Sequence, residues 1–589
     1  MVIGHDSIEL YKRGREAWND WAKEKLAEKD QLIQKAMWLA AEHSNHRLAG
    51  QNPETEGWLR TAKAEFATQK LMEANFSGFV FPGEVNFEQT NLLNADFSNA
   101  VFYELACFNN SIFGDSSSSG PVLFDGVSFT KRVEFEHIQC GSFSAKNAKF
   151  TEASWRGSSL GVVHFSDVIV SDSASFESTS FTKALFSHVA FEGDVFFDKA
   201  SFVGKTEFIE SRFGGHVSFE NSSFESSTRF EAIQFCERAN FFASTFKACV
   251  NFDAPEFMAE AVFSRTQFKG EAIFLKPSFS SDGLFINIVF NKEASFLDAI
   301  FKEDALFSGS SFHKNLFFDH TRFEGSSNFD KVVFQEFAYF IGAYFKGEAT
   351  FIAVKGDSFF TLKDAVFESV PDFRQAHFAE APQLDNATFY SDRGTAIIDD
   401  FPVRWRALKR LAIQSHDHPR ELNFFAEEIK SMRNVEHRRL PNWSNFSKDI
   451  PLWPGGSKYW MGMLYEVLSD FGRSILRPLG WLMVVMVFFS VFYFLCHLHF
   501  SPFDVEPSRA VDCEPVFGAI YLAMQNGLLF SGLGRSSKLE KTYACLYGGD
   551  PSDPTMPDLV VFFGMLQTLF SAVLIFLLLL AIRNHFRIK

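Results

Sequence analysis

Phenylalanine recurs at a fixed interval through the middle of the chain. From Phe186 to Phe351 it occupies every eleventh position, and a second series from Phe191 to Phe345 follows five residues behind the first. The spacing therefore alternates between five and six. Small residues recur two places before the first series, and the other positions carry mostly Gly, Ser, Asn, Asp and Thr, which favour turns over helix. The pattern predicts a coil of short strands with aromatic and small side chains inside and polar side chains outside.

An eleven-residue period is also compatible with a right-handed supercoil of helices. A helix would require apolar residues at spacings of three and four, whereas only the spacings of five and six are regular here. We therefore expect β-structure, in which the phenylalanines of successive turns stack into interior ladders. The residues taken to represent this core are Phe219, Phe230, Phe241, Phe252 and Phe263.

Short stretches of this region resemble the pentapeptide-repeat family, in a Phe-centred variety. Residues 95–99 (ADFSN) and 239–243 (ANFFA) carry the resemblance, which extends over roughly residues 74–391. It implies a mainly β fold, a right-handed four-sided β-helix with one pentapeptide on each side. The alternating spacing gives about 22 residues per turn instead of the 20 of the simple family, so we expect two sides of each turn to carry a one-residue bulge.

Helical patterns flank the repeat at residues 1–73 and 392–455. A β-helix has two open ends that invite edge pairing, so the N-terminal segment is expected to cap the first turn, with an oligomer contact as the alternative. The second segment is expected to be a helical linker or adaptor. Its basic cluster is predicted either to face anionic headgroups or to form salt bridges on a solvated helix. The cluster consists of Arg404, Arg406, Lys409 and Arg410.

Two apolar runs, residues 479–497 and 559–582, contain no Asp, Glu, Lys or Arg. Each is long enough to cross a hydrocarbon core of about 30 Å, and the alternative is a pair of buried helices in a soluble core. Arg473 and Arg477 precede the first run, and Arg583 follows the second. The positive-inside rule therefore places both outer ends in the cytoplasm. Residues 456–475 are predicted to form an amphipathic helix at the membrane interface.

The first ten residues lack the basic start and apolar run of a secretory signal. We therefore expect the β-helix and both termini on the cytoplasmic side of a bacterial inner (plasma) membrane. Residues 476–589 then form the transmembrane domain, and the segment between its two spans lies on the far side.

The segment at about 515–535 resembles the pore loop of two-span potassium-channel-like proteins. A short apolar stretch, too short to span, is followed by Ser531, Gly532, Leu533 and Gly534. The two glycines match the family's TVGYG filter, whereas Ser531 stands for Val and Leu533 for Tyr. The resemblance implies a filter lined by backbone carbonyls. Arg535 replaces the acidic residue that often follows and would repel cations at the mouth, so potassium selectivity does not follow from the match.

Four further residues belong to the predicted pore region. Gln525 and Asn526 are expected either to line the ion path or to form hydrogen bonds with neighbouring helices. Cys513 and Cys545 flank the loop on the predicted outer face. Because disulfides form in the periplasm or outside the cell, we expect these two cysteines to form a bond that staples the loop.

The charge balance and the motifs argue against several classes of function. With 56 Lys and Arg against 72 Asp and Glu, the net charge of −16 argues against a nucleic-acid binder. The sequence carries no P-loop, nucleophile elbow, HExxH or CxxC pair, so we expect no enzyme, cofactor or metal site. His416 and His418 flank an aspartate before a proline and are interpreted as part of a turn, not as metal ligands.

The leading hypothesis is an oligomeric ion channel, cation-conducting, with the β-helix as a cytoplasmic sensor or scaffold. Two helices and a loop cannot enclose a pore alone, and the channel resemblance implies a homotetramer in contact with membrane lipid. One alternative is a membrane-anchored scaffold that conducts nothing. Another is a β-helix that binds a cytoplasmic protein or ligand, as acidic pentapeptide-repeat rods that mimic DNA bind topoisomerases.

Overall fold

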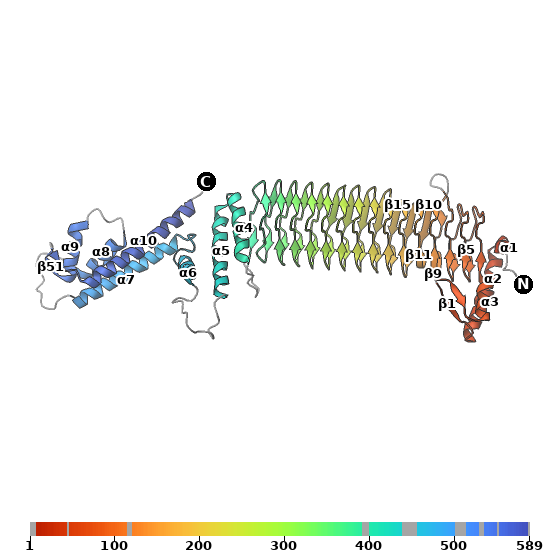
Figure 1. Ribbon diagram of the computed structural model, residues 1–589, viewed down its shortest axis with the longest axis horizontal. Coiled ribbons are helices and arrows are strands. Elements are labelled where there is room, and N and C mark those ends of the chain that lie inside the picture. The colour runs from red at the N-terminus through yellow and green to blue at the C-terminus, as the bar shows by residue number, and fades with distance from the viewer. Residues whose placement is uncertain are drawn as a thin grey trace. The chain divides into compact units, whose positions relative to one another are not determined.

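The computed structural model describes residues 7–43, 46–114, 120–390, 400–438, 456–500, 514–528, 535–550 and 553–586. The chain divides into two compact units, Met1–Thr395 and Ala396–Lys589. The first unit consists of short helices followed by a long β-solenoid, and the second is almost entirely helical (Figure 1).

The solenoid runs from β3 (Ala64–Glu65) to β50 (Thr388–Phe389), and most of its strands are two to four residues long. All pairings between its strands are parallel, as Figure 1 shows in the stack of short arrows. From β16 (Ala190–Phe191) to β48 (Val366–Phe367), strands pair with the strand four places later, at a register of 22 residues. About fifteen turns of about 22 residues result, which confirms the mainly β solenoid.

The turns before β16 differ in length. Val80 pairs with Val101, 21 residues on, and Val101 pairs with Ser128, 27 residues on. The longest strands also lie in this region: β9 (Ser128–Glu134), β10 (Gln139–Lys146), β11 (Lys149–Ser154), β12 (Ser159–Ser166) and β15 (Ser180–Ser187). The constant 22-residue register therefore begins where the unbroken phenylalanine series begins.

The interior is filled by stacked phenylalanine rings. Phe219 stacks on Phe241 at 4.9 Å with an interplanar angle of 5°, and Phe230 stacks on Phe252 at 4.6 Å and 4°. Rings of neighbouring ladders meet edge to face, as Phe219 does with Phe230 at 5.9 Å and 84°. These four rings and Phe263 are fully buried. The expected ladders are confirmed, and each aromatic pair contributes about 0.5–1.5 kcal/mol beyond its buried area.

Residues with left-handed backbone recur every eleven positions, as at Asn221 (φ 57°) and Ala232 (φ 49°). In the turn from Phe219 to Ser222, the Ser222 N–H donates to the Phe219 carbonyl at 3.1 Å. A positive φ at the third residue makes this a type II turn. The left-handed residue lies in the five-residue spacing. The extra residue of the six-residue spacing is instead accommodated at a bend, for example around Gly215.

Not every polar side chain faces outward, so that expectation was wrong at one position of the repeat. The hydroxyl groups of Ser222, Ser244 and Thr266 are buried. Each donates to a phenylalanine carbonyl of the preceding coil, at 2.5, 2.5 and 2.7 Å respectively. Each of these carbonyls also accepts a main-chain N–H within its own turn, so the hydroxyl ladder supplies a second donor to the acceptor and a partner for the buried hydroxyl.

The N-terminal segment contains α1 (Ser7–Lys12), α2 (Arg15–Gln34), the hairpin of β1 (Ala40–Glu42) and β2 (Leu48–Gly50), and α3 (Pro53–Ala62). Trp18 of α2 is fully buried and stacks on Phe66 of the first coil at 5.7 Å. Its indole N–H donates to the Val80 carbonyl at 2.8 Å, and the Ser7 hydroxyl accepts from the Glu65 N–H at 2.9 Å. Strand pairing begins at β3, ahead of the boundary at residue 74 drawn from the sequence.

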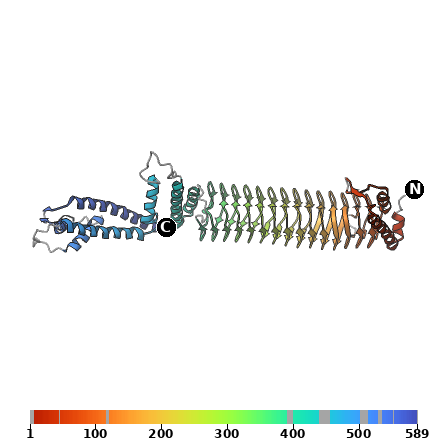
Figure 2. The same ribbon diagram turned by 90° about the horizontal axis from the view of Figure 1, so that it is seen from below.

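The second unit contains α4 (Phe401–Gln414), α5 (His418–Arg438), α6 (Gly456–Ser469), α7 (Leu476–Phe500), α8 (Pro515–Gly527), α9 (Arg535–Tyr547), β51 (Gly549–Asp550), β52 (Asp553–Pro554) and α10 (Asp558–Phe586). Helices α7 and α10 are each long and apolar enough to cross a membrane. They contain the two predicted spans and lie side by side (Figure 2).

Candidate functional site

The short helix α8 packs against both long helices, α7 and α10. Leu522 and Ala523 of α8 are buried in one apolar cluster with Phe489 of α7 and Val560 of α10. The predicted short helix between the spans is therefore present, and it ends at Gly527. At about 1.5 Å per residue, its 13 residues extend about 20 Å, too short to cross about 30 Å of hydrocarbon.

A buried polar network ties α7, α8 and α10 together. The Tyr493 hydroxyl on α7 donates to Gln567 Oε1 on α10 at 2.8 Å and accepts from Asn526 Nδ2 on α8 at 3.1 Å. Gln567 Nε2 in turn donates to the Ala523 carbonyl at 2.8 Å. Tyr493 and Gln567 have no exposed surface. Because polar groups buried in apolar surroundings cost free energy unless they are paired, this network fixes how α8 sits between the two long helices.

The helices approach closely at two glycines beside this network. A Cβ atom on Gly564 of α10 would lie 3.1 Å from Asn526 Nδ2 and 3.5 Å from the Tyr493 hydroxyl. A Cβ atom on Gly527, the last residue of α8, would lie 2.6 Å from the Met486 sulfur. The Ser571 hydroxyl lies beside Gly527, is buried, and has no hydrogen-bond partner among the described atoms.

The two amides singled out in the sequence differ in their contacts. Asn526 joins α8 to Tyr493, as one of the two expected roles requires. Gln525 Nε2 donates to the Tyr521 hydroxyl at 2.8 Å, one turn back on the same helix. Of the predicted filter, Ser531, Gly532, Leu533 and Gly534 lie outside the described residues.

Helix α9 was not anticipated from the sequence. Its first residue is Arg535, the position predicted at the pore mouth. Its last turn is anchored to α7: the Tyr547 hydroxyl donates to the Tyr493 carbonyl at 3.2 Å, and His497 Nδ1 lies 2.6 Å from the Leu546 carbonyl oxygen. The segment after the predicted filter is therefore fixed to the first long helix.

The cysteines of the two units differ in their chemical state. Cys545 on α9 is disulfide-bonded. Its expected partner, Cys513, lies outside the described residues, so the pairing stays a prediction. In the solenoid, burial raises the pKa of the Cys140 thiol to about 12 and that of Cys107 to about 11. These thiols are free and behave as small core residues.

Within the part of the chain that the structure describes, no cluster of three or more His, Cys, Asp or Glu is arranged to hold a metal.

The basic cluster of α4 takes part in salt bridges. Arg404 Nε lies 3.0 Å from Asp400 Oδ1. Arg406 and Lys409 share the carboxylate of Glu428 on α5, at 2.8 and 2.5 Å. Three of the four basic residues therefore pair with carboxylates. Because Glu428 has two cationic partners, one positive charge is left in excess.

Comparison with known proteins supports the repeat. A family model described as Pentapeptide repeats (8 copies) matches residues 83–115. No curated protein matches the chain. The match covers a segment in which Phe87, Leu92, Phe97 and Phe102 follow at intervals of five, before the six-residue spacing becomes regular. The chain thus carries pentapeptide repeats in a Phe-rich β-solenoid, followed by two helices able to cross a membrane.

Proposed function

We propose that the protein is an oligomeric membrane ion channel whose pentapeptide-repeat solenoid is a cytoplasmic sensor or scaffold. One observation carries the proposal: α8 is too short to cross a membrane, yet it is held between two apolar helices by a buried hydrogen-bond network. A helix that ends at membrane depth is tolerated where protein covers it or water lines it. A pore provides both, because protein covers the helix and water lines the channel.

The position of the network sets the depth of α8. Gln567 lies eight residues, about 12 Å, inside the apolar stretch that begins at Leu559. Through Gln567 and Ala523, the C-terminal end of α8 is held at that depth. The C-terminal end of a helix carries partial negative charge, which stabilises a cation nearby. This supports cations as the permeant species.

The remaining features of the proposal follow from the spans. Two long helices and one short helix cannot enclose a pore, so several chains assemble, and four is the number we propose. The basic residues at the ends of the spans support our proposal that both termini and the solenoid are cytoplasmic and that the channel lies in a bacterial inner membrane. We propose no catalytic role. The proposed role of the solenoid is to bind a cytoplasmic protein or ligand, which is unidentified. We also propose that its turns are four-sided, since strands pair with the strand four places later.

Ion flux tests this function. Purified full-length protein in liposomes would be exposed in turn to gradients of K⁺, Na⁺ and Cl⁻. The proposal predicts cation flux above that of protein-free vesicles. Absence of flux for every ion, from protein shown to be folded and inserted, would favour the non-conducting membrane-anchored scaffold instead.

A further inference from the structure

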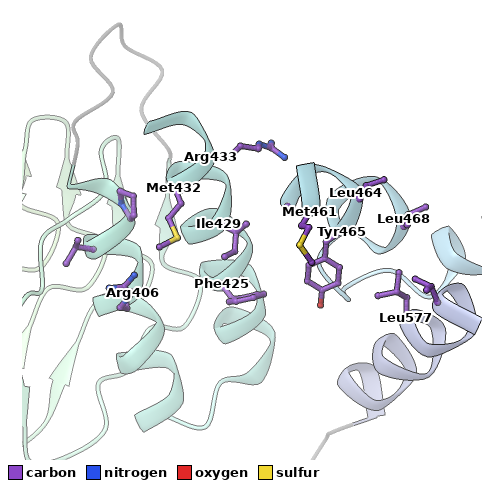
Figure 3. Close-up of a pocket in the computed structure, with 14 residues that line it drawn as sticks. Arg406, Phe425, Ile429, Met432, Arg433, Met461, Leu464, Tyr465, Leu468 and Leu577 are labelled. Carbon is purple, nitrogen blue, oxygen red and sulfur yellow. The ribbon is translucent and has the colours of Figure 1, made fainter. Parts of the chain in front are cut away.

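An apolar groove of about 760 Å³ lies where α4, α5, α6 and α10 come together. Figure 3 shows Phe425, Ile429 and Met432 of α5 on one side and Met461 and Tyr465 of α6 on the other. The groove belongs to neither the polar network of α8 nor the solenoid.

The groove reaches from the apolar stretch of α10 to polar helices. Val573 and Leu577 line it, and both lie within residues 559–582. Leu577 is five residues, about 7.5 Å, from the end of that stretch, which Arg583 follows. At the other side the lining includes Arg406 on α4. A ligand that fills the groove must therefore be apolar at one end and carry a polar or charged group that can bind Arg406 at the other.

The charged part of the lining is cationic. Arg433 of α5 lies 2.6 Å from the Glu466 carboxylate of α6, so this pair is neutral. Arg406 shares Glu428 with Lys409, which leaves one positive charge in excess at that wall. Arginine at such a position suits the oxygens of a phosphate group, which it can bind through two parallel hydrogen bonds.

We propose that this groove binds a phospholipid with an anionic headgroup. An acyl chain lies against Ile429, Met461 and Leu577, and the headgroup phosphate lies against Arg406. The bound lipid bridges α5 to α6 and α10, so it ties the helices that follow the solenoid to the second apolar helix. This inference rests on the membrane-spanning part of the proposed function and not on ion conduction.

The test is lipid binding to the full-length protein, purified in detergent and delipidated, followed by native mass spectrometry. Phosphatidylglycerol and phosphatidylcholine with identical acyl chains would be titrated separately. We expect phosphatidylglycerol to bind about fivefold more tightly, since one cation near a headgroup adds about 1 kcal/mol. The variant Arg406→Gln should lower phosphatidylglycerol binding to the level of phosphatidylcholine.

A second variant tests the apolar half without changing charge. A Cβ atom on Gly462 of α6 would lie 3.6 Å from Ile429 Cγ2, so a leucine there fills the groove. Gly462→Leu should weaken both lipids about tenfold or more. Arg420→Gln is the matched control, because Arg420 is on α5, pairs with Asp417, and does not line the groove. It should leave binding unchanged.

Equal affinity of the native protein for the two lipids would overturn the proposal, and so would full phosphatidylglycerol binding by both groove variants. Groove residues covered by a second copy of the chain, shown by cross-linking, would also overturn it. The result of the lipid-binding experiment can be distinguished from the result for ion conduction. A protein that binds phosphatidylglycerol in the groove but passes no ion would keep this inference and refute the channel.

Discussion

The side-chain amide of Asn19 occupies the place of a neighbouring strand beside Val80. Asn19 Oδ1 accepts from the Val80 N–H at 2.9 Å, and Asn19 Nδ2 donates to the Gly78 carbonyl at 3.0 Å. A solenoid exposes a row of unpaired main-chain groups at its first coil, and such an edge can pair with another chain. One asparagine on α2 thus satisfies both a donor and an acceptor of that edge.

Replacing Asn19 with alanine should weaken the first coil and expose its edge. We expect a loss of about 1–2 kcal/mol, because one main-chain donor and one acceptor lose their partners. Concentration-dependent association should increase as well. Urea unfolding and size-exclusion chromatography of the full chain measure both effects. Asp20→Ala, at an exposed position on the same helix, should change neither; equal behaviour of the two variants would refute the capping role.

The phenylalanine ladder should dominate the stability of the solenoid. Phe241 is fully buried and stacks on Phe219 at 4.9 Å and on Phe263 at 4.7 Å. Phe241→Ala should lower the free energy of unfolding by about 3–5 kcal/mol, since it leaves a cavity in a close-packed stack. Phe242→Ala is the control, because the adjacent ring is half-exposed. A cost below about 1 kcal/mol for Phe241→Ala would contradict the ladder as the main source of stability.

Removal of the Tyr493 hydroxyl should disturb the placement of α8. Tyr493→Phe leaves Asn526 and Gln567 each without one hydrogen-bond partner in an apolar environment, at a cost of about 1–3 kcal/mol for each group. We expect a lower melting temperature and reduced ion flux. Thr568→Val is the matched change on α10, because the Thr568 hydroxyl bonds only to Gly564 of its own helix. If both variants melt and conduct alike, the network does not position α8.

The thiol of Cys140 should resist alkylation in the native protein. Burial raises its pKa to about 12 from an ordinary value of 9.0. At pH 8 we expect labelling of half-exposed Cys236 and none of Cys140 until urea is added. Between about pH 9 and pH 12 the unfolded state releases this proton while the native state keeps it. Cys140 therefore makes stability fall by about 1.4 kcal/mol per pH unit across that window. Native labelling of Cys140 at pH 8 would contradict its burial.

Sequence reasoning predicted the features that repeat or extend along the chain. The eleven-residue series of phenylalanines indicated a period of 22, and the uncharged runs indicated the two long helices. The hydroxyl ladder also has a sequence signal, because Ser222, Ser244 and Thr266 are 22 residues apart. It was missed because serine and threonine between the phenylalanines were taken to face solvent.

Other contacts leave no signal in a single sequence. Tyr493 and Gln567 are 74 residues apart, and nothing local marks either as the partner of the other. Asn19 sits 61 residues from Val80 on a helix whose pattern shows amphipathicity, not edge pairing. Such pairs depend on how separate elements meet, which spacing along the chain does not encode.

Single-channel recording is the most direct test of ion conduction. The native protein, reconstituted in a planar bilayer, would be compared with Gly532→Ala/Gly534→Ala and with Gly480→Ala, a control glycine on α7 where an added Cβ meets nothing within 4 Å. We expect cation-selective current from the native protein and from Gly480→Ala, and loss of this current in the double variant. Current that persists unchanged in the double variant would contradict a carbonyl-lined pore at residues 531–534, and silence of the native protein under every ion gradient would contradict the channel itself.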